Sequence, residues 1–312
     1  MNNILTVIIP VYNTEQYIER CINSVLNQTE KRIEVIIIND ASTDTSAEKI
    51  QKYATKSNIR IVNNKKNIGQ GNCRNIGLSM VNTKYFCFLD SDDWVDSNAY
   101  KESIINLEKN QDCDIALFGI KTEYDNANQS IMRYEYNYNI IDNNFALSIL
   151  SREYTQDIYI SVLLGNKVFR SNKFIKILSF DNVNYEDILF TYKAIVLSKK
   201  LILQSNIYLH YYQRQNSIMH SFSINYIDDL FVVFQELKSY LKSIDKLNVK
   251  QYYSFFEKCC TSMLDSMFFS TQKQEEQKKY IKHFISKLNE YEMLYDIIDY
   301  LDINRFKKML FL

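Results

Sequence analysis

What the sequence lacks excludes several classes of protein. The chain of 312 residues contains one proline and five glycines, which indicates few flexible linkers. Five scattered glycines cannot supply a glycine-rich phosphate-binding loop of the Walker type. The formal net charge is +0 at pH 7, so no overall electrostatic field draws the chain to nucleic acid. These features favour an ordinary globular protein over a disordered one.

The six cysteines lack the C-x-x-C spacing of metal and redox centres, and several lie in apolar runs. This arrangement predicts reduced, buried thiols in a cytoplasmic protein. The apolar run near the amino terminus is short and contains Pro10, which is not typical of a signal peptide. No later run is long enough to span a bilayer, so we expect no transmembrane helix.

The first hundred residues alternate between strand patterns and helix patterns. Continuous apolar runs, typical of strands buried on both faces, lie at 5–12, 33–40, 59–62 and 85–90. Segments with helical spacing separate these runs, and we expect Asn13 to cap the first helix. Helices between successive strands predict an α/β fold with a parallel sheet.

The remainder of the chain divides into a mixed region and a helical region. In the mixed region the patterns predict helices at 97–109, 143–151 and 185–198, strands at 114–120, 201–204 and 207–212, and added strands or a flap at 121–138. Beyond Phe222 the pattern is helical to the end of the chain. We therefore predict a catalytic-type domain at 1–220, with halves at 1–98 and 99–220, and a helical domain at 221–312.

Polar residues stand at or directly after the carboxyl end of each of the first four predicted strands. They are Tyr12 and Asn13, Asn39 and Asp40, the run 63–67, and the aspartates Asp90, Asp92 and Asp93. Ligands of open parallel sheets bind beyond these strand ends, so we expect the site there. Any one of these positions alone would be explained by a solvated loop or a helix cap.

The run from Gly69 to Arg74 begins like a dinucleotide-binding fingerprint, but Arg74 stands where a third glycine is required. If the ligand carries phosphates, a divalent cation held by carboxylates is the alternative means of neutralising them. The oxygens of the run 90–93 suit Mn²⁺ or Mg²⁺. Such a cation would also offset the repulsion between the clustered aspartates.

Seven segments of the chain resemble, in order, the motifs of inverting family 2 glycosyltransferases with the GT-A fold. They are "VIIPVYNTEQYIERCINSVLNQT", "EVIIINDASTDTS", "NIGQGNCRNIGLSM", "YFCFLDSDDW", "GNKVFR", "NYEDILF" and "YYQRQNSIMHS". The resemblance covers about residues 4–221 and implies a Rossmann-like, mostly parallel sheet flanked by helices. We recognise no family pattern in the last ninety or so residues.

The resemblance implies a donor site for a UDP-sugar. By position, Tyr12 would pack on the uracil, Asp40 would accept from its ring N–H, Arg74 would hold the base from the other side, and Asp90 would bind ribose hydroxyls. The nucleotide-sugar site would also include Pro10, Asn13, Asn67, Ser91, Arg214 and Ser217. Asp92 would ligate the Mn²⁺ or Mg²⁺; Asp93 would support the turn and be a weaker candidate for the metal. His220 is either a metal or phosphate ligand or an ordinary surface histidine.

The resemblance places the catalytic base at Asp187, with Glu186 contacting the acceptor or the donor sugar. Acidic residues at a helix start are also favoured by the helix dipole alone. One base without a paired nucleophile agrees with a single displacement that inverts the anomeric carbon. The acceptor would be a glycan or a lipid-linked oligosaccharide of a bacterial surface polysaccharide. Gly165 departs from the family, where many relatives have a large aromatic residue, so acceptor geometry does not transfer.

Two other readings stay open. A phosphotransferase with an aspartyl nucleophile also places D-x-D after a strand, but it would want Thr or Val where Trp94 stands. An inactive relative in a glycan-assembly complex is the second. Outside the site, we expect Trp94 and His210 to be structural and His283 to be solvated.

The basic and apolar run 305–312 has the composition of an interfacial helix, which would attach the protein to the inner face of the plasma membrane. The same composition fits a helix packed on its own catalytic domain, or on another subunit of a homo-oligomer.

Overall fold

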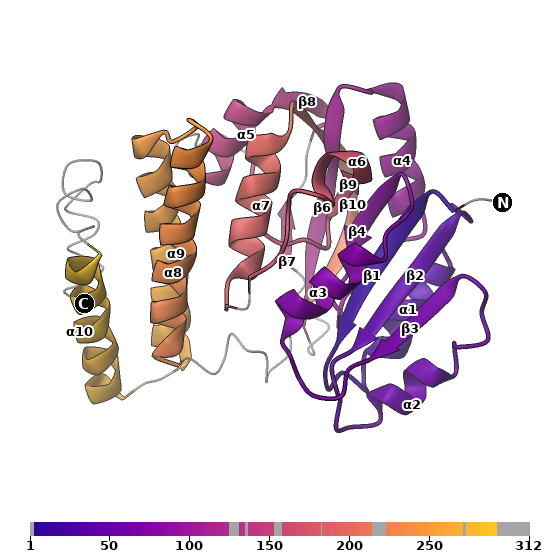
Figure 1. The fold of residues 1–312 in the computed structure, drawn as a ribbon, viewed down its shortest axis with the longest axis horizontal. Helices are drawn as coiled ribbons and strands as arrows, with labels where there is room; N and C mark the ends of the chain where they lie inside the picture. Colours follow the sequence, from indigo (N-terminus) through magenta and orange to yellow (C-terminus); the bar gives the residue numbers. More distant parts are fainter. Residues whose placement is uncertain are drawn as a thin grey trace. The chain divides into compact units, whose positions relative to one another are not determined.

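The structure, a computed structural model, describes residues 3–124, 131–134, 137–152, 158–181, 183–213, 223–270 and 273–291. The chain divides into two compact units, drawn in Figure 1. The first unit comprises Met1–Ala146, Ser161–Asn182 and Glu186–Gln213; the second comprises Leu147–Ile160, Val183–Tyr185 and Arg214–Leu312. The division at residue 220 that the sequence suggests stays a prediction, since 214–222 lie outside the described residues.

The first unit is built on a 10-stranded mixed sheet with the order β3-β2-β1-β4-β9-β6-β10-β5, to which β7 adds beside β6 and β8 beside β10. The strands are β1 (Leu5–Val11), β2 (Ile33–Asn39), β3 (Ile59–Asn63), β4 (Tyr85–Phe88), β5 (Trp94–Val95), β6 (Cys113–Tyr124), β7 (Ile131–Tyr134), β8 (Asn139–Asp142), β9 (Lys167–Arg170) and β10 (Lys200–Gln213). The neighbours β3, β2, β1 and β4 all run parallel, as the alternating pattern predicts. The predicted α/β class is confirmed.

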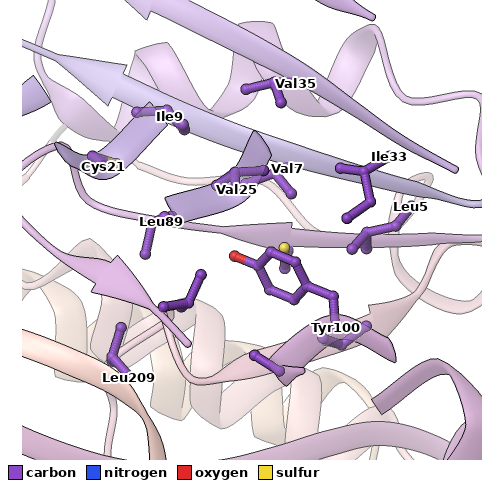
Figure 2. Close-up of a cluster of buried hydrophobic side chains, with 14 of the residues drawn as sticks. Leu5, Val7, Ile9, Cys21, Val25, Ile33, Val35, Leu89, Tyr100 and Leu209 are labelled. Carbon is purple, nitrogen blue, oxygen red and sulfur yellow. The ribbon is translucent and has the colours of Figure 1, made fainter. Parts of the chain in front are cut away.

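The helices described in the chain are α1 (Ile18–Leu26), α2 (Ser46–Gln51), α3 (Gln70–Ser79), α4 (Ala99–Lys109), α5 (Asn143–Leu150), α6 (Ser171–Phe174), α7 (Glu186–Leu197), α8 (Asn225–Ser243), α9 (Val249–Ser270) and α10 (Gln274–Glu290). Side chains alternate between the two faces of a strand, so β1 serves two helix layers. Leu5, Val7 and Ile9 join one cluster with Val25 of α1 and Tyr100 of α4, shown in Figure 2.

The opposite face of β1 carries α3. A β-carbon on Gly77 of α3 would lie well inside van der Waals contact with Cγ2 of Ile8. The absence of a side chain at Gly77 therefore lets α3 approach the sheet closely, and this approach sets how α3 lies at the strand ends.

Two local predictions are wrong. The first helix begins at Ile18, and Asn13 does not cap it; its Oδ1 accepts a hydrogen bond from the Thr43 backbone at 2.8 Å, which joins the loops after β1 and β2. The runs 201–204 and 207–212 form one strand, β10, because a register shift between Leu203 and Ile207 against β6 absorbs the polar residues between them. The added strands expected within 121–138 are present as the end of β6 and as β7.

In the second unit, α8, α9 and α10 pack through aromatic side chains, with the Phe231 ring centre 5.6 Å from that of Phe256 and 5.5 Å from that of Phe284. His283 was expected in solvent, but its Nε2 lies 2.8 Å from Oδ1 of Asp228, so this histidine joins α10 to α8. None of the helices described is long and apolar enough to cross a bilayer. The run 305–312 lies outside the described residues.

Candidate functional site

The pairing between β1 and β4 ends before β1 itself ends. The last pair is Ile8 with Phe88, after which Leu89 N–H donates to Ile8 O at 3.0 Å. Backbone groups of alternate residues face the same neighbouring strand, and Pro10 is the next residue of β1 on the β4 side. Since proline has no N–H, the ladder cannot continue. The chain leaves β4 at this point, and the acidic turn 90–93 follows next to the end of β1.

Three strand ends at this edge carry a residue with left-handed backbone. The φ angles are 51° at Asn13 after β1, 56° at Ala41 after β2 and 90° at Gly69 after β3. For alanine this conformation costs about 1 kcal/mol or more, and such strain is concentrated at functional sites. The loops at this edge of the sheet therefore contain backbone conformations that are uncommon in ordinary loops.

Helix α1 supports the acidic turn that follows β4. Within the turn, Asp93 N–H donates to Asp90 O at 3.0 Å. Arg20 Nη2 donates to Asp92 O at 2.9 Å, and the Cys21 thiol donates to Asp90 O at 3.5 Å. The Arg20 guanidinium also lies 3.6 Å from the centre of the Trp94 ring. The backbone of the acidic turn is therefore held from one side by two residues of α1.

The buried guanidinium of Arg74 balances the clustered carboxylates. Its Nη2 lies 2.9 Å from Asp90 Oδ1 and its Nη1 lies 2.5 Å from Glu186 Oε1, while only 3% of the side chain is exposed. Gln70, one turn earlier on α3, donates from Nε2 to the same Asp90 oxygen at 2.8 Å. Desolvation makes an ion pair at such a site costly unless its hydrogen bonds are satisfied. Asp90 Oδ1 accepts two hydrogen bonds, whereas Nε of Arg74 is buried without a hydrogen-bond partner among the described residues. Arg74 thus joins the turn after β4 to the start of α7.

Glu186 and Asp187 open α7 beside Arg74. Asp187 Oδ1 accepts from the Ile188 backbone N–H at 2.9 Å. Burial raises the pKa of Asp187 to about 7; the negative charges of Glu186 and Asp90 also raise it, and Arg74 lowers it. A carboxyl group with this pKa can take up a proton near neutral pH. The segment predicted to carry the base is therefore at the same edge as the acidic turn.

Asp93 connects the acidic turn to strand β10 of the sheet. It is 2% exposed, and its Oδ1 accepts from Tyr212 N–H at 2.9 Å, which ties the turn to β10. Burial raises the pKa of Asp93 well above its usual range, and the neighbouring charges of Asp92 and Asp90 act in the same direction. This environment favours the supporting role of Asp93 over its role as a metal ligand.

Asp92 is the carboxylate of the turn that could take part in holding a cation. No group of three or more His, Cys, Asp or Glu side chains in the described part of the chain is arranged to hold a metal. Magnesium sites that use substrate phosphates need only one or two carboxylates, and Asp92 keeps partial exposure at the turn. His220 lies outside the described residues.

The structure brings most of the other predicted residues to the same edge. Tyr12 is 47% exposed, Asn67 is exposed and Ser91 is buried. The buried Asp40 carboxylate accepts from Gly69 N–H at 2.9 Å and from Asn64 Nδ2 at 2.8 Å, so here it shapes the loop before α3. Arg214 and Ser217 lie outside the described residues.

Sequence reasoning missed Arg20 and Gln70. The spacing of Gln70 and Arg74, four residues apart on one helix, places them on the same face and could have indicated Gln70. Nothing in the sequence signalled Arg20. Trp94 and His210 are structural as expected, since their rings stack at 4.7 Å and His210 Nδ1 lies 2.8 Å from Glu123 Oε1.

Comparisons with known proteins show what the chain is similar to. The model of glycosyl transferase family 2 matches residues 6–170. Glycosyltransferase GlyG of Streptococcus pneumoniae serotype 4 is 26% identical over 257 residues, which cover 76% of this chain and 80% of GlyG. Glycosyltransferase GlyA of the same organism is 29% identical over 169 residues, which are 54% of this chain but only 22% of GlyA.

Among solved structures, residues 1–349 of S. aureus TarS in complex with UDP-GlcNAc align with a TM-score of 0.72 and 22% identity. The alignment covers 92% of this chain and 80% of that one. At this identity the similarity establishes the fold.

Proposed function

Since the chain belongs to glycosyl transferase family 2, we propose that it transfers one sugar from a UDP donor to a hydroxyl group of a glycan or lipid-linked acceptor, with inversion. The process served would be synthesis of a bacterial surface polysaccharide, and the sugar a hexose or N-acetylhexosamine. The catalytic domain would be 1–220, with 221–312 as a helical addition. A UDP-sugar donor is supported by TarS, a protein of the same fold that binds UDP-GlcNAc.

The observation that carries the proposal is the bridge from Asp90 through Arg74 to Glu186. Asp90 belongs to the turn assigned to the donor, and Glu186 precedes the carboxylate assigned as base. The buried guanidinium of Arg74 lies within hydrogen-bonding distance of the carboxylates of both Asp90 and Glu186. A donor bound at the turn would therefore have its sugar beside α7, which is the proximity that direct displacement needs.

Asp187 acts as the general base in this mechanism. The acceptor hydroxyl gives its proton to the Asp187 carboxylate while its oxygen bonds to the anomeric carbon of the donor. The bond between that carbon and the phosphate oxygen breaks, and its electron pair leaves with UDP. The pKa of about 7 allows Asp187 to be unprotonated before the step and to accept the proton during it. The transition state is oxocarbenium-like, so nearby carboxylates stabilise it.

The nucleotide would lie over the ends of β1, β2 and β4. The exposed ring of Tyr12 offers a face for the uracil, and Asp40 with the loop before α3 encloses its edge. When bound, Mn²⁺ or Mg²⁺ at Asp92 would neutralise charge on the diphosphate as UDP leaves. Pro10, Asn13, Asn67 and Ser91 would line the site, and Arg214 and Ser217 would contact the pyrophosphate.

A panel of UDP-sugars tests the proposal. UDP release is measured with Mn²⁺, with and without chelator, in the presence of an acceptor extract. We expect release with one or a few donors, loss on chelation, and loss in Asp187→Asn. Release that ignores the chelator would contradict the metal requirement, and no release from any donor would contradict the transferase itself.

A further inference from the structure

We infer that Asn75 is a positioning residue: it fixes α7 against α3 and so sets where Glu186 and Asp187 lie at the donor site. The inference rests on the proposed function for its catalytic consequence. The anchoring itself can be measured without turnover.

The side chain of Asn75 is hydrogen-bonded to both backbone groups of one residue. Its Nδ2 donates to Phe180 O at 2.7 Å, and its Oδ1 accepts from Phe180 N–H at 2.8 Å. A side-chain amide is matched to a peptide group in this way only at one distance and orientation, since both bonds must form together. The pair therefore fixes the backbone of Phe180 against α3.

The ring of Phe180 continues the connection to α7. It stacks on Phe190 with ring centres 4.3 Å apart and planes at 2°. Phe190 lies one turn after Glu186 on α7, so the two residues share a face of that helix. Helix α7 is thus attached to α3 at two levels, at Glu186 through Arg74 and at Phe190 through Phe180 and Asn75.

Helix α3 is shaped to receive this segment closely. A β-carbon on Gly71 would lie 2.8 Å from Asp181 O and 3.4 Å from Glu186 Cγ. Because Gly71 has no side chain, the backbone of residues 180–181 can pack directly against α3 at this position. The Arg74 guanidinium lies 5.3 Å from the centre of the Phe180 ring, which places the Asn75 contact directly beside the bridge to Asp90.

Two attachments have a mechanical consequence for the base. The later turns of α7 are also held by the sheet, because Phe190 packs on the rings of Phe88 and Phe169. The Asn75 contact adds an attachment close to the first turn of α7, where Glu186 and Asp187 lie. A displacement of about 1 Å at a catalytic group can cost about a hundredfold in rate, so even a modest loosening should be measurable.

The test compares Asn75→Ala with Asn82→Ala. Asn82 is an exposed residue just after α3 whose Nδ2 bonds to Met80 O at 3.2 Å, so the control makes the same chemical change away from the Phe180 contact. Hydrogen–deuterium exchange of the peptide 178–190 is measured for each purified chain. With the UDP-sugar that gives most UDP release, kcat, KM for the donor and the pH dependence of kcat are measured as well.

We expect the hydrogen–deuterium exchange rate of 178–190 to rise about tenfold in Asn75→Ala and to stay at the wild-type rate in Asn82→Ala. Only Asn75→Ala loses the two hydrogen bonds to the Phe180 backbone. We expect kcat to fall at least about tenfold, KM for the donor to change less than about twofold, and the acid limb of the pH profile to move. Wild-type exchange and kcat in Asn75→Ala would overturn the inference. So would parallel losses in both variants.

If Asn75→Ala does not fold, Asn75→Asp takes its place. This variant keeps the acceptor for Phe180 N–H and loses the donor, so its exchange and kcat should lie between those of the wild type and those of a complete loss. Wild-type values in Asn75→Asp would then overturn the inference. A wild-type chain that uses no UDP-sugar overturns the proposed function, while the exchange of 178–190 still decides whether Asn75 anchors α7.

Discussion

The guanidinium of Arg74 lies 2.5 Å from the carboxylate of Glu186, a residue 112 positions later in the chain. The same guanidinium holds Asp90 of the acidic turn. Its positive charge offsets the repulsion that three closely spaced aspartates would otherwise create in a half-buried turn. The contact also brings the segment that carries Asp187 to the strand ends where the nucleotide is expected.

Replacing Asp187 with Asn should remove the base and leave the nucleotide site intact. We expect kcat to fall by about 10²–10⁴-fold, the usual contribution of a general base. The affinity for UDP, measured by calorimetry with Mn²⁺, should change less than about twofold, because the expected nucleotide contacts are unchanged. Asp265→Asn on the exposed surface of α9 is the matched control. Equal loss of transfer and of UDP binding would mean that Asp187 supports the site instead of acting as its base.

The rate of transfer should depend on pH through Asp187. The base works in its unprotonated form, so with a pKa of about 7 we expect kcat/KM to rise with pH and level off above about 7. Below that value it should fall about tenfold per pH unit. A profile that is flat from pH 5 to pH 8 would contradict the assignment of Asp187.

Two neighbours should move this acid limb in opposite directions. Glu186 raises the pKa of Asp187 and Arg74 lowers it. Glu186→Gln should therefore shift the limb to lower pH, and Arg74→Met should shift it to higher pH, even though both variants lose activity. Glu48→Gln on the exposed surface of α2 should leave the limb in place. Shifts of the same sign in both site variants would show that the limb reports another group.

Replacing Asp92 with Ala should weaken UDP binding in the presence of Mn²⁺ by about tenfold or more, since the remaining oxygens would hold the cation poorly. In chelator, the wild type and the variant should bind UDP alike, because the cation then makes no contribution. Titration calorimetry under both conditions measures this difference. An equal drop with and without chelator would assign Asp92 to the fold of the turn instead of to the cation.

Replacing Gly77 with Ala should destabilise the protein. Alanine favours a helix by up to about 1 kcal/mol over glycine. The added β-carbon, however, would collide with Ile8 Cγ2 and lie 3.3 Å from Ile38 Cδ1. Both residues belong to paired central strands, β1 and β2, which cannot easily move away from α3. Overpacking typically costs about 1–3 kcal/mol, so we expect a net loss of about 1–2 kcal/mol in the free energy of unfolding.

Urea unfolding measures this loss, with Gly165→Ala as a glycine control. There the nearest atoms are two methyl groups of Leu209 at 3.3 Å, which can move by a few tenths of an ångström. Stability of Gly77→Ala at or above that of Gly165→Ala would contradict the packing argument.

The alternation of apolar runs with helical segments was sufficient to predict the parallel order of the amino-terminal strands, because that periodicity reflects burial on both faces of a sheet. It was also sufficient to place Tyr12, Asp40 and Asp90 at one edge, since carboxyl ends of parallel strands meet there. The sequence could not indicate that β9 enters between β4 and β6 and runs antiparallel to both. Strand pairing between distant segments has no local signature.

By itself, then, the sequence determined the amino-terminal buried strands, the helices between them and the chemical types at the site. The tertiary structure alone decided the partners: Asp93 with Tyr212, Arg20 with Asp92, and Arg74 between Asp90 and Glu186. The division has a physical reason. Periodicity records which side of an element is buried, whereas a charge or an amide finds its partner only when packing brings distant segments within about 3 Å.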